Sequence, residues 1–353
     1  MALTIGGYTM MTKLKSRRIF LWLVLFGLAG CMDFDEYDND PKGNFEALWT
    51  IMDEHYCFFT SKNIDWNAAH DRYAPRVSAD MGQEALFYLL NDMLKEVRDG
   101  HVNLASSFDV GRYDAWYYDS IENFNLKLIE DKYLGRDYLV ASGLKYKVLD
   151  DNVGYIYYSS FSNNIGEGNL DHVIKKFESC HGIVIDVRDN GGGALTNVDI
   201  LASRFTNEKV LVGYILHKRG VGHNDFSEPY PRYLDSSTRL RFQKPVVVLT
   251  NRKTYSAANE FASVMKQLPN VRLMGSTTGG GGGLPFSSEL PNGWSVRFSA
   301  SPMLDPDMKD IEEGVTPHYY IGMDDEKLPS ATQDDVIEAA RAYIKMQEGF
   351  VCD

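Results

Sequence analysis

A short run of β-branched residues that leads through a turn into a helix constrains the fold of this chain more than any other feature. Residues 246–249 are apolar throughout, as is typical of a buried strand, and a polar turn follows them. A helical pattern begins at Ser256, with Phe261, Val264 and Met265 on one side. We therefore expect a layered α/β core in which strands alternate with helices.

Ser256, at the point where this strand gives way to the helix, admits two interpretations. An ordinary N-cap is the commoner role of a serine before a helix. A nucleophile is the other, because a hydroxyl placed here projects into a cleft and the first N–H groups of a helix stabilise a nearby negative charge. The segment alone leaves both interpretations open.

A second strand candidate also ends in residues suited to chemistry. Residues 183–187 are apolar apart from Asp186, and Arg188, Asp189, Asn190 and three glycines follow. Glycines let a backbone approach a ligand closely, and their N–H groups can point at one anionic oxygen. A flexible turn is the simpler interpretation. The spacing excludes a phosphate loop and a dinucleotide fingerprint.

Four motifs together resemble the C-terminal processing (tail-specific) serine peptidase family, which includes the tricorn core protease and the interphotoreceptor retinoid-binding protein modules. They are Asp-Val-Arg-Asp-Asn-Gly-Gly-Gly at 186–193, Thr-Tyr-Ser-Ala-Ala-Asn-Glu at 254–260, Gly-Ser-Thr-Thr-Gly-Gly at 275–280 and Gly-Val-Thr-Pro at 314–317. The resemblance extends over residues 152–323 and, more weakly, over 45–104. It implies a crotonase-like or ClpP-like spiral of β-β-α units with a small N-terminal helical domain, and serine endopeptidase activity without a cofactor or metal.

The family has two catalytic subtypes, and the resemblance here is to the tricorn-like one. The other subtype uses a lysine after the Thr-x-Gly motif, but this chain has no lysine between Lys266 and Lys309. The tricorn-like subtype uses a histidine from an N-terminal segment, and Asp-Gly-His-Val-Asn-Leu at 99–104 matches its context. The resemblance therefore implies His101 as general base, a task suited to an ordinary pKa of about 6.5. Alone, His101 would be interpreted as a turn histidine.

The acid that orients this histidine is open among three carboxylates. In the tricorn-like enzymes a glutamate just before the Gly-x-x-Pro motif acts through a serine that precedes the histidine. Glu312 is accordingly preferred, and Glu313 and Asp99 are the alternatives. Gly100 stands where the relay serine would be, so the relay itself departs from the family pattern.

The implied reaction is acyl transfer from a peptide to water. His101 would deprotonate Ser256, which attacks the peptide carbonyl, and the N–H groups of Gly192 and Ala257 would hold the oxyanion, with Gly193 as the neighbouring candidate. Two other hypotheses remain. One is a catalytically silent peptide- or ligand-binding lipoprotein on the same fold, and the other is an acyl-thioester enzyme.

The amino terminus resembles a bacterial lipoprotein signal. A positive patch at 13–18 precedes an apolar stretch at 19–28, and Leu-Ala-Gly-Cys follows at 28–31. We expect residues 1–30 to be removed and Cys31 to be lipidated, although an ordinary cleaved signal or an anchor helix would share some of these features. The expected location is the bacterial cell envelope, lipid-anchored to the outer membrane on its periplasmic face or at the cell surface.

The rest of the chain divides into segments of different character. We expect a signal peptide (1–30), an acidic linker (31–42), an N-terminal helical domain (43–103), a strand-rich connector (104–145), a peptidase core (146–328) and a C-terminal helix (329–353). The connector is too short for the PDZ domain that many relatives carry there. The glycine run at 279–283 is interpreted as a mobile border of the substrate cleft, or else as a disordered surface loop.

Charge and cysteine usage restrict the partners. Lysine and arginine number 36 against 49 aspartates and glutamates, giving a net charge of −13. This acidity argues against nucleic-acid binding, which requires a basic patch. The four cysteines and eight histidines show no zinc-type spacing. Peptide or protein substrates and the membrane are the expected partners; the oligomeric state cannot be derived from the sequence.

Overall fold

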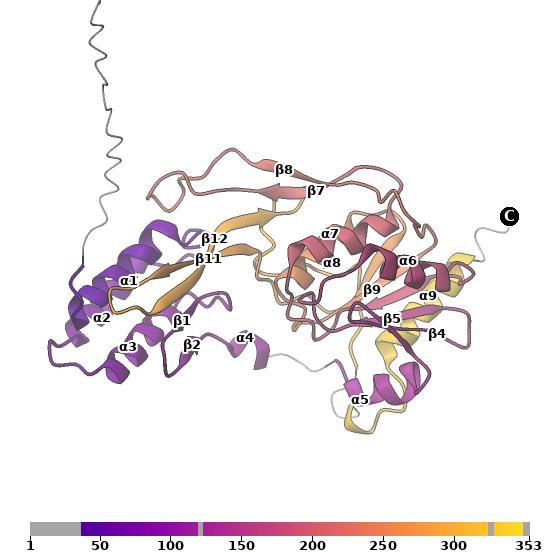
Figure 1. The fold of residues 1–353 in the computed structure, drawn as a ribbon, viewed down its shortest axis with the longest axis horizontal. Helices are drawn as coiled ribbons and strands as arrows, with labels where there is room; N and C mark the ends of the chain where they lie inside the picture. The colour runs from indigo at the N-terminus through magenta and orange to yellow at the C-terminus, as the bar shows by residue number, and fades with distance from the viewer. Residues whose placement is uncertain (1–36, 119–122, 324–327, 349–353) are drawn as a thin grey trace, which may run out of the picture. The chain divides into compact units, whose positions relative to one another are not determined.

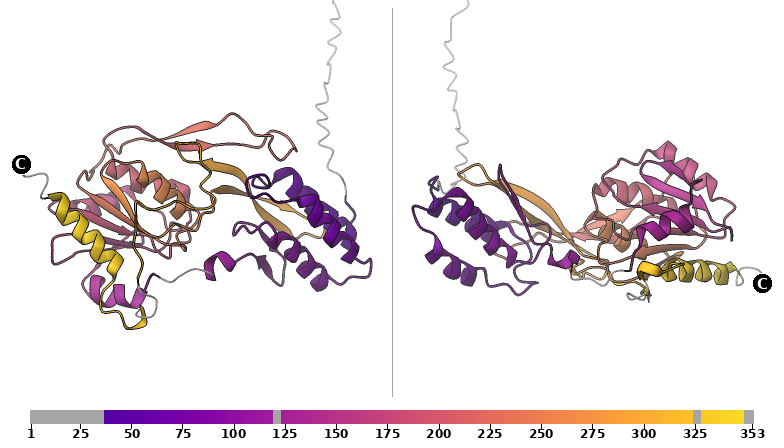
Figure 2. Two further views of the ribbon diagram at one scale, coloured as in Figure 1. Left: turned by 180° about the vertical axis from the view of Figure 1, so that it is seen from behind. Right: turned by 90° about the horizontal axis from the view of Figure 1, so that it is seen from below.

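Two β-sheets of different character organise residues 37–118, 123–323 and 328–348, the part of the chain that the computed structural model describes (Figures 1 and 2). The first sheet has the order β13-β10-β9-β6-β5-β4-β3. Its strands are β3 (Leu139–Ala141), β4 (Leu144–Val148), β5 (Gly154–Tyr158), β6 (Ile183–Asp186), β9 (Val246–Thr250), β10 (Val271–Gly275) and β13 (Tyr319–Tyr320). The strands from β5 to β13 are parallel, whereas β3, β4 and β5 pair antiparallel.

The second sheet is antiparallel. It has the order β2-β1-β12-β7-β8, and β11 also pairs with β12. Its strands are β1 (Asn103–Ala105), β2 (Val110–Arg112), β7 (Val210–Ile215), β8 (Tyr230–Leu234), β11 (Gly283–Glu289) and β12 (Ser295–Leu304). Strand β1 begins two residues after His101, so pairing with β12 fixes the position of that histidine.

The parallel sheet is covered on both faces, which explains why its central strands are apolar throughout. Alternate residues of β9 point to opposite sides, with Val246 and Val248 in one core cluster and Val247 and Leu249 in another. The first cluster contains residues of α6 (Glu167–Lys176), α7 (Leu195–Ala202) and α8 (Ala257–Lys266). The second contains residues of α5 (Leu126–Leu128), η2 (Ile129–Leu134) and α9 (Asp335–Glu348).

The N-terminal helices do not have a core of their own. They are α1 (Pro41–His55), α2 (Trp66–Tyr73) and α3 (Gln83–Lys95), with the short turn η1 (Ala74–Arg76) between the last two. Their buried side chains form one cluster with Trp294, Val296 and Phe298. The segment predicted as a helical domain, 43–103, therefore shares its core with the β11–β12 hairpin from late in the chain. The predicted domain boundaries stay predictions.

Several sequence expectations can be compared with these elements. The α/β class is confirmed. The described part of 104–145 forms short elements, including α4 (Ala115–Tyr118), and no separate PDZ-like domain. The predicted signal peptide, Cys31 and the first half of the acidic linker lie outside the described residues. Among the helices that are described, none is long and apolar enough to cross a membrane.

Candidate active site

The backbone at Ser256 adopts an unusual conformation immediately before α8. Its φ is 57° and its ψ is −122°, a region that residues other than glycine rarely occupy and that costs about 1–3 kcal/mol. The Ser256 N–H donates to the Gly280 carbonyl oxygen at 2.9 Å. The hydroxyl makes no capping hydrogen bond to the helix. The N-cap interpretation of this side chain is therefore wrong.

The Ser256 hydroxyl instead meets the predicted histidine. Its Oγ lies 2.9 Å from Nε2 of His101, across 155 positions of sequence. His101 follows α3 in a tight turn in which its backbone N–H donates to Asp99 Oδ1 at 2.7 Å. Its ring lies 5.0 Å from the ring of Tyr255, between centroids. The structure thus brings together the two residues that the motifs single out.

Burial controls the protonation of His101, which is only 4% exposed. Desolvation lowers the pKa of His101 to about 4; Asp99 opposes this shift, and the charges of Arg297 and Lys62 add to it. A histidine with this pKa is neutral at pH 7. The Nε2 atom that faces Ser256 is therefore available to accept a proton.

The other ring nitrogen has no carboxylate partner. If Nε2 is to accept the serine proton, Nδ1 must carry the ring hydrogen. Nδ1 is buried, and no hydrogen bond joins it to a described carboxylate. Nδ1 has no hydrogen-bond partner in the part of the chain that the structure describes.

Two of the three candidate acids belong to a buried cluster around Lys62. The Lys62 Nζ atom lies 2.7 Å from Glu312 Oε1 and 4.0 Å from Asp99 Oδ2. Asp99 Oδ2 accepts from the Ser299 hydroxyl at 2.9 Å, and Glu312 Oε2 accepts from the Gly282 N–H at 2.8 Å. Lys62 and Gly282 therefore fix the position of the Glu312 carboxylate.

Charge balance explains the pKa shifts in this cluster. Burial raises the pKa of Glu312, and the Asp99 charge raises it further, although Lys62 opposes both. Burial would lower the pKa of Lys62, but Asp99 and Glu312 outweigh it and the pKa is raised. Two carboxylates share one ammonium group, so Lys62 stays charged while Glu312 takes up a proton more readily than a free glutamate. The third candidate, Glu313, is exposed.

The glycine run at 279–283 is buried and tightly packed, so it is not a disordered surface loop, and a mobile cleft border does not fit it either. A Cβ on Gly280 would lie 1.7 Å from the Glu312 carbonyl oxygen, and one on Gly281 would lie 2.6 Å from the Tyr255 ring. The Gly281 N–H donates to the Glu312 carbonyl at 3.3 Å. The run therefore acts as a spacer that touches the segments carrying the serine, the histidine and the glutamate.

The three predicted oxyanion donors differ in their hydrogen-bond partners, and their role stays a prediction. The Gly192 N–H donates to Asn190 Oδ1 at 2.9 Å and is occupied. The N–H groups of Gly193 and Ala257 donate to no described group. Gly192 nevertheless lies against the nucleophile, because a Cβ added there would come within 2.9 Å of the Ser256 Cβ. Gly193 and Ala257 are the available pair of donors.

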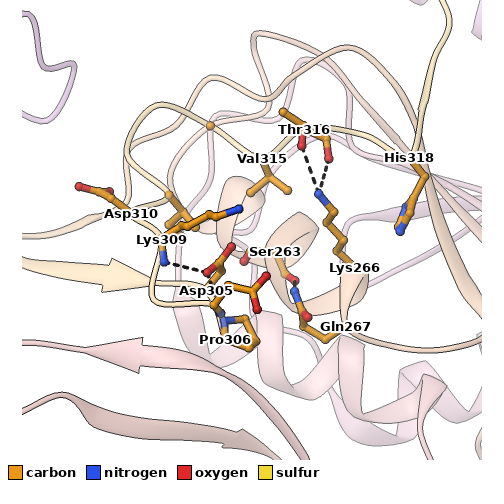
Figure 3. Close-up of a pocket in the computed structure, with 13 residues that line it drawn as sticks. Ser263, Lys266, Gln267, Asp305, Pro306, Lys309, Asp310, Val315, Thr316 and His318 are labelled. Atoms are coloured by element: carbon orange, nitrogen blue, oxygen red, sulfur yellow. Dashed lines mark hydrogen bonds between the residues drawn. The ribbon is translucent and has the colours of Figure 1, made fainter.

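A separate hollow of about 400 Å³ lies along α8 away from Ser256 (Figure 3). Two of its charged side chains are already engaged: Lys266 donates to the carbonyl and hydroxyl oxygens of Thr316, and Asp305 Oδ1 accepts from the backbone N–H of Lys309. His318 accepts the Leu273 N–H on Nδ1 and so joins β10 to the β13 segment. We assign this hollow no function.

The described ranges contain no group of three or more His, Cys, Asp and Glu side chains arranged to hold a metal ion. Cys57 and Cys180 are both free and buried.

Sequence comparison relates two parts of the chain, one of which contains Ser256, to known enzyme families. The family model described as Peptidase family S41 matches residues 152–321, and the one described as Tricorn protease C1 domain matches residues 37–95. The carboxy-terminal processing protease CtpA of Bacillus subtilis is 26% identical over 208 residues, which are 58% of this chain and 42% of the relative. The chain thus spans less than half the length of the curated relatives that it matches.

Solved structures resemble the whole described fold. The crystal structure of a candidate peptidase from Parabacteroides merdae is 53% identical, covers 87% of this chain and 97% of its own, and superposes with a TM-score of 0.83. The tricorn protease is 14% identical with a TM-score of 0.52, over 87% of this chain and 37% of its own, a likeness of fold alone.

Proposed function

This chain belongs to peptidase family S41, and on that premise we propose that it is a serine endopeptidase that forms an acyl-enzyme on Ser256 with His101 as general base. One observation carries the proposal: Ser256 Oγ lies 2.9 Å from Nε2 of a histidine that burial keeps neutral. A strained serine whose hydroxyl faces a base, and not its own helix, is what nucleophilic catalysis requires.

The reaction would proceed in two stages. Ser256 Oγ attacks the peptide carbonyl as its proton passes to His101 Nε2, and the Gly193 and Ala257 N–H groups stabilise the oxyanion. Collapse of this intermediate breaks the C–N bond, and His101 gives its proton to the leaving amine. Water, deprotonated by His101, then attacks the ester and releases Ser256 and the free acid.

Asp99 and Glu312 would support His101 in different ways. Asp99 holds the backbone N–H of His101, and its charge favours the imidazolium that forms during the reaction. Glu312 makes no described contact with the ring, so its orienting role stays a prediction that would operate through Lys62 and the glycine run.

Peptidase activity should persist to unusually low pH. Because the free enzyme must hold His101 neutral and its pKa is lowered to about 4, we expect kcat/KM to be half-maximal near pH 4 and to reach its plateau well below pH 6.5. A profile of kcat/KM from pH 3 to 8 measures this midpoint. A midpoint at pH 6.5 or higher would contradict a buried, neutral base.

Acid unfolding has to be monitored in the same experiment. The folded pKa of His101 lies below its unfolded value, so the unfolded chain binds the proton more tightly. The resulting stabilisation is complete above about pH 6.5 and is lost as pH falls toward 4. Circular dichroism at each pH therefore separates titration of the base from loss of the fold.

Replacing Lys62 should move the same pH profile. In Lys62→Met, one of the two charges that oppose protonation of His101 is gone while Arg297 and Asp99 remain, so we expect the kcat/KM midpoint to rise by up to about one pH unit. Stability should fall by about 1–3 kcal/mol, a limited loss because Glu312 can take up a proton. Lys62→Arg, which keeps the charge, should restore the midpoint; equal profiles for all three forms would exclude a positioning role.

We also propose that the enzyme is anchored to the envelope by lipid on Cys31, as the sequence 28–31 suggests. The test is mass spectrometry of the amino-terminal peptide from the native host beside Cys31→Ser. A mature chain that begins at Cys31 with a lipid mass would support the anchor. An unmodified Cys31 would remove it.

Cleavage of an unbiased peptide library, followed by mass spectrometry, tests the proposed activity directly. The full chain would be compared with Ser256→Ala and His101→Ala, after circular dichroism shows that all three are folded. We expect cleavage by the parent alone. Cleavage that survives His101→Ala would remove the base assignment, and no cleavage by any form would favour a silent peptide-binding protein on the same fold.

A further inference from the structure

A hollow that adjoins the Lys62 cluster is lined mainly by side chains that the proposed mechanism does not use. It has a volume of about 560 Å³, and its lining includes Lys62, Arg98, Tyr113, Arg252 and Glu313. It shares Lys62 with the buried cluster next to His101. The hollow therefore adjoins the cluster that holds Asp99 and Glu312.

The charge of this hollow is opposite to that of the chain as a whole. The chain carries a net charge of −13, yet three cations and one carboxylate line the hollow. Lys62 is engaged by Glu312 and Asp99. Neither Arg98 nor Arg252 has an ion-pair partner in the part of the chain that the structure describes, and Arg252 donates only to the Thr278 carbonyl, at 3.3 Å. Two guanidinium groups are thus available to an anion.

Both arginines come from the loops that carry the catalytic pair. Arg98 precedes His101 by three positions, and Arg252 precedes Ser256 by four. Arg98 has a φ of 48°, which is unusual for a residue with a side chain, and Lys62 Nζ donates to its carbonyl oxygen at 3.3 Å. Strained backbone of this kind persists only where its surroundings hold it, and it gathers at functional sites.

We propose that this hollow is a substrate subsite that binds a carboxylate of the peptide, through Arg98 and Arg252; the inference rests on the proposed peptidase function. A guanidinium group matches a carboxylate by two parallel hydrogen bonds, a geometry that lysine cannot reproduce. The carboxylate belongs either to an aspartate or glutamate side chain or to the free carboxyl terminus of the peptide. The negative net charge of the enzyme would then disfavour acidic substrates at long range, while this subsite selects them on contact.

Glu313 supplies an internal control for this proposal. It is exposed at the edge of the hollow, and no ion pair within 4.0 Å joins it to Arg98 or Arg252 in the described chain. Its charge repels an incoming carboxylate. Glu313→Gln should therefore increase the preference for acidic peptides, whereas removal of either guanidinium should decrease it. A general loss of structure would not produce these opposite effects.

The test uses a peptide library prepared with free and with amidated carboxyl termini. The full-length parent would be compared with Arg98→Gln, Arg252→Gln, Glu313→Gln and the control Arg136→Gln, which removes an exposed arginine outside the hollow. We expect the parent to favour a carboxylate at one fixed position from the scissile bond by about tenfold over the amide, because charge-assisted hydrogen bonds are worth that much or more. Arg98→Gln and Arg252→Gln should abolish most of this preference.

The two sources of carboxylate give different patterns. A preference that follows aspartate or glutamate and survives amidation identifies a side-chain subsite, whereas one that disappears on amidation identifies the terminal carboxylate. No carboxylate preference in the parent would overturn the proposal. A preference that stays unchanged in both arginine variants, or that falls equally in Arg136→Gln, would overturn it as well.

A binding experiment separates failure of the subsite from failure of the peptidase. Immobilised Ser256→Ala protein, which turns over no substrate if the mechanism is right, is incubated with the same library, and the retained peptides are identified by mass spectrometry. Retention that depends on carboxylates and on Arg98 and Arg252 supports the subsite even if the parent cleaves nothing. Retention without such dependence overturns the subsite and leaves the proposed peptidase activity intact.

Discussion

Ser256→Ala is expected to reduce kcat by on the order of 10⁵- to 10⁶-fold, because no other group can form the acyl-enzyme. Its Oγ is the atom that faces His101 Nε2 at 2.9 Å, and it takes no part in capping α8. Ser256 Oγ makes no other hydrogen bond within the described residues. Its removal should therefore change the free energy of unfolding by less than about 0.5 kcal/mol. Rates on one cleaved library peptide, together with urea unfolding, measure both quantities.

Two further substitutions sharpen this result. Ser256→Gly also removes the hydroxyl, but glycine tolerates the observed φ of 57°, so this variant should be inactive and more stable than the parent by about 1 kcal/mol. Ser263→Ala changes a buried serine on the same helix, two turns further on, and should leave kcat unchanged. Activity that survives Ser256→Ala but not Ser263→Ala would refute the assignment of the nucleophile.

Arg188→Met is expected to lower the free energy of unfolding by about 3–5 kcal/mol, the cost of leaving a buried charge without its partner. Arg188 is completely buried and binds both oxygens of Asp186, at 2.9 and 2.7 Å. It also contacts both oxygens of Asp334, whose side chain accepts the Val336 and Ile337 N–H groups at the start of α9. Two aspartates with no exposure would lose their counter-ion at once.

Urea unfolding of the parent and of two controls tests this expectation. Arg188→Lys keeps the positive charge but loses the paired N–H donors of the guanidinium group. Its free energy of unfolding should therefore lie between those of the parent and Arg188→Met. Arg72→Met breaks a largely exposed ion pair with Glu96 and should cost less than about 1 kcal/mol. If Arg188→Met lowers the free energy of unfolding no more than Arg72→Met does, the buried ion pairs do not stabilise the fold as described.

The elements of the parallel sheet could be predicted because their chemistry is local. The run at 246–249 is strand β9, and the run at 183–187 is strand β6 with its first following residue. Parallel pairing of these strands, with Asp186 opposite Leu249, brings the loops that follow them to the same edge of the sheet. Sequence reasoning could not foresee that the N-terminal helices complete their core with residues 290–298, because that contact joins distant segments.

The candidate site was predictable where a motif marks it and not elsewhere. Ser256 and His101 stand in recognisable contexts, whereas Lys62 lies in an unremarkable loop and meets Glu312 across 250 positions. The glycine run was misjudged because glycine looks the same in a sequence whether it serves flexibility or close packing. The occupied Gly192 N–H depends on the rotamer of Asn190, which no spacing reveals.

The parts of the candidate site are far apart in the sequence, so a ribosome synthesises them at different times. Strand β1, which holds His101 in place, pairs with residues 295–297. Lys62 likewise has its partner, Glu312, late in the chain. A nascent chain that has already exposed Ser256 therefore still lacks a fixed base. If Ser256 and His101 act as proposed, the enzyme becomes active only after residues 295–312 have folded onto the earlier segments, and the unfinished chain cannot cut itself.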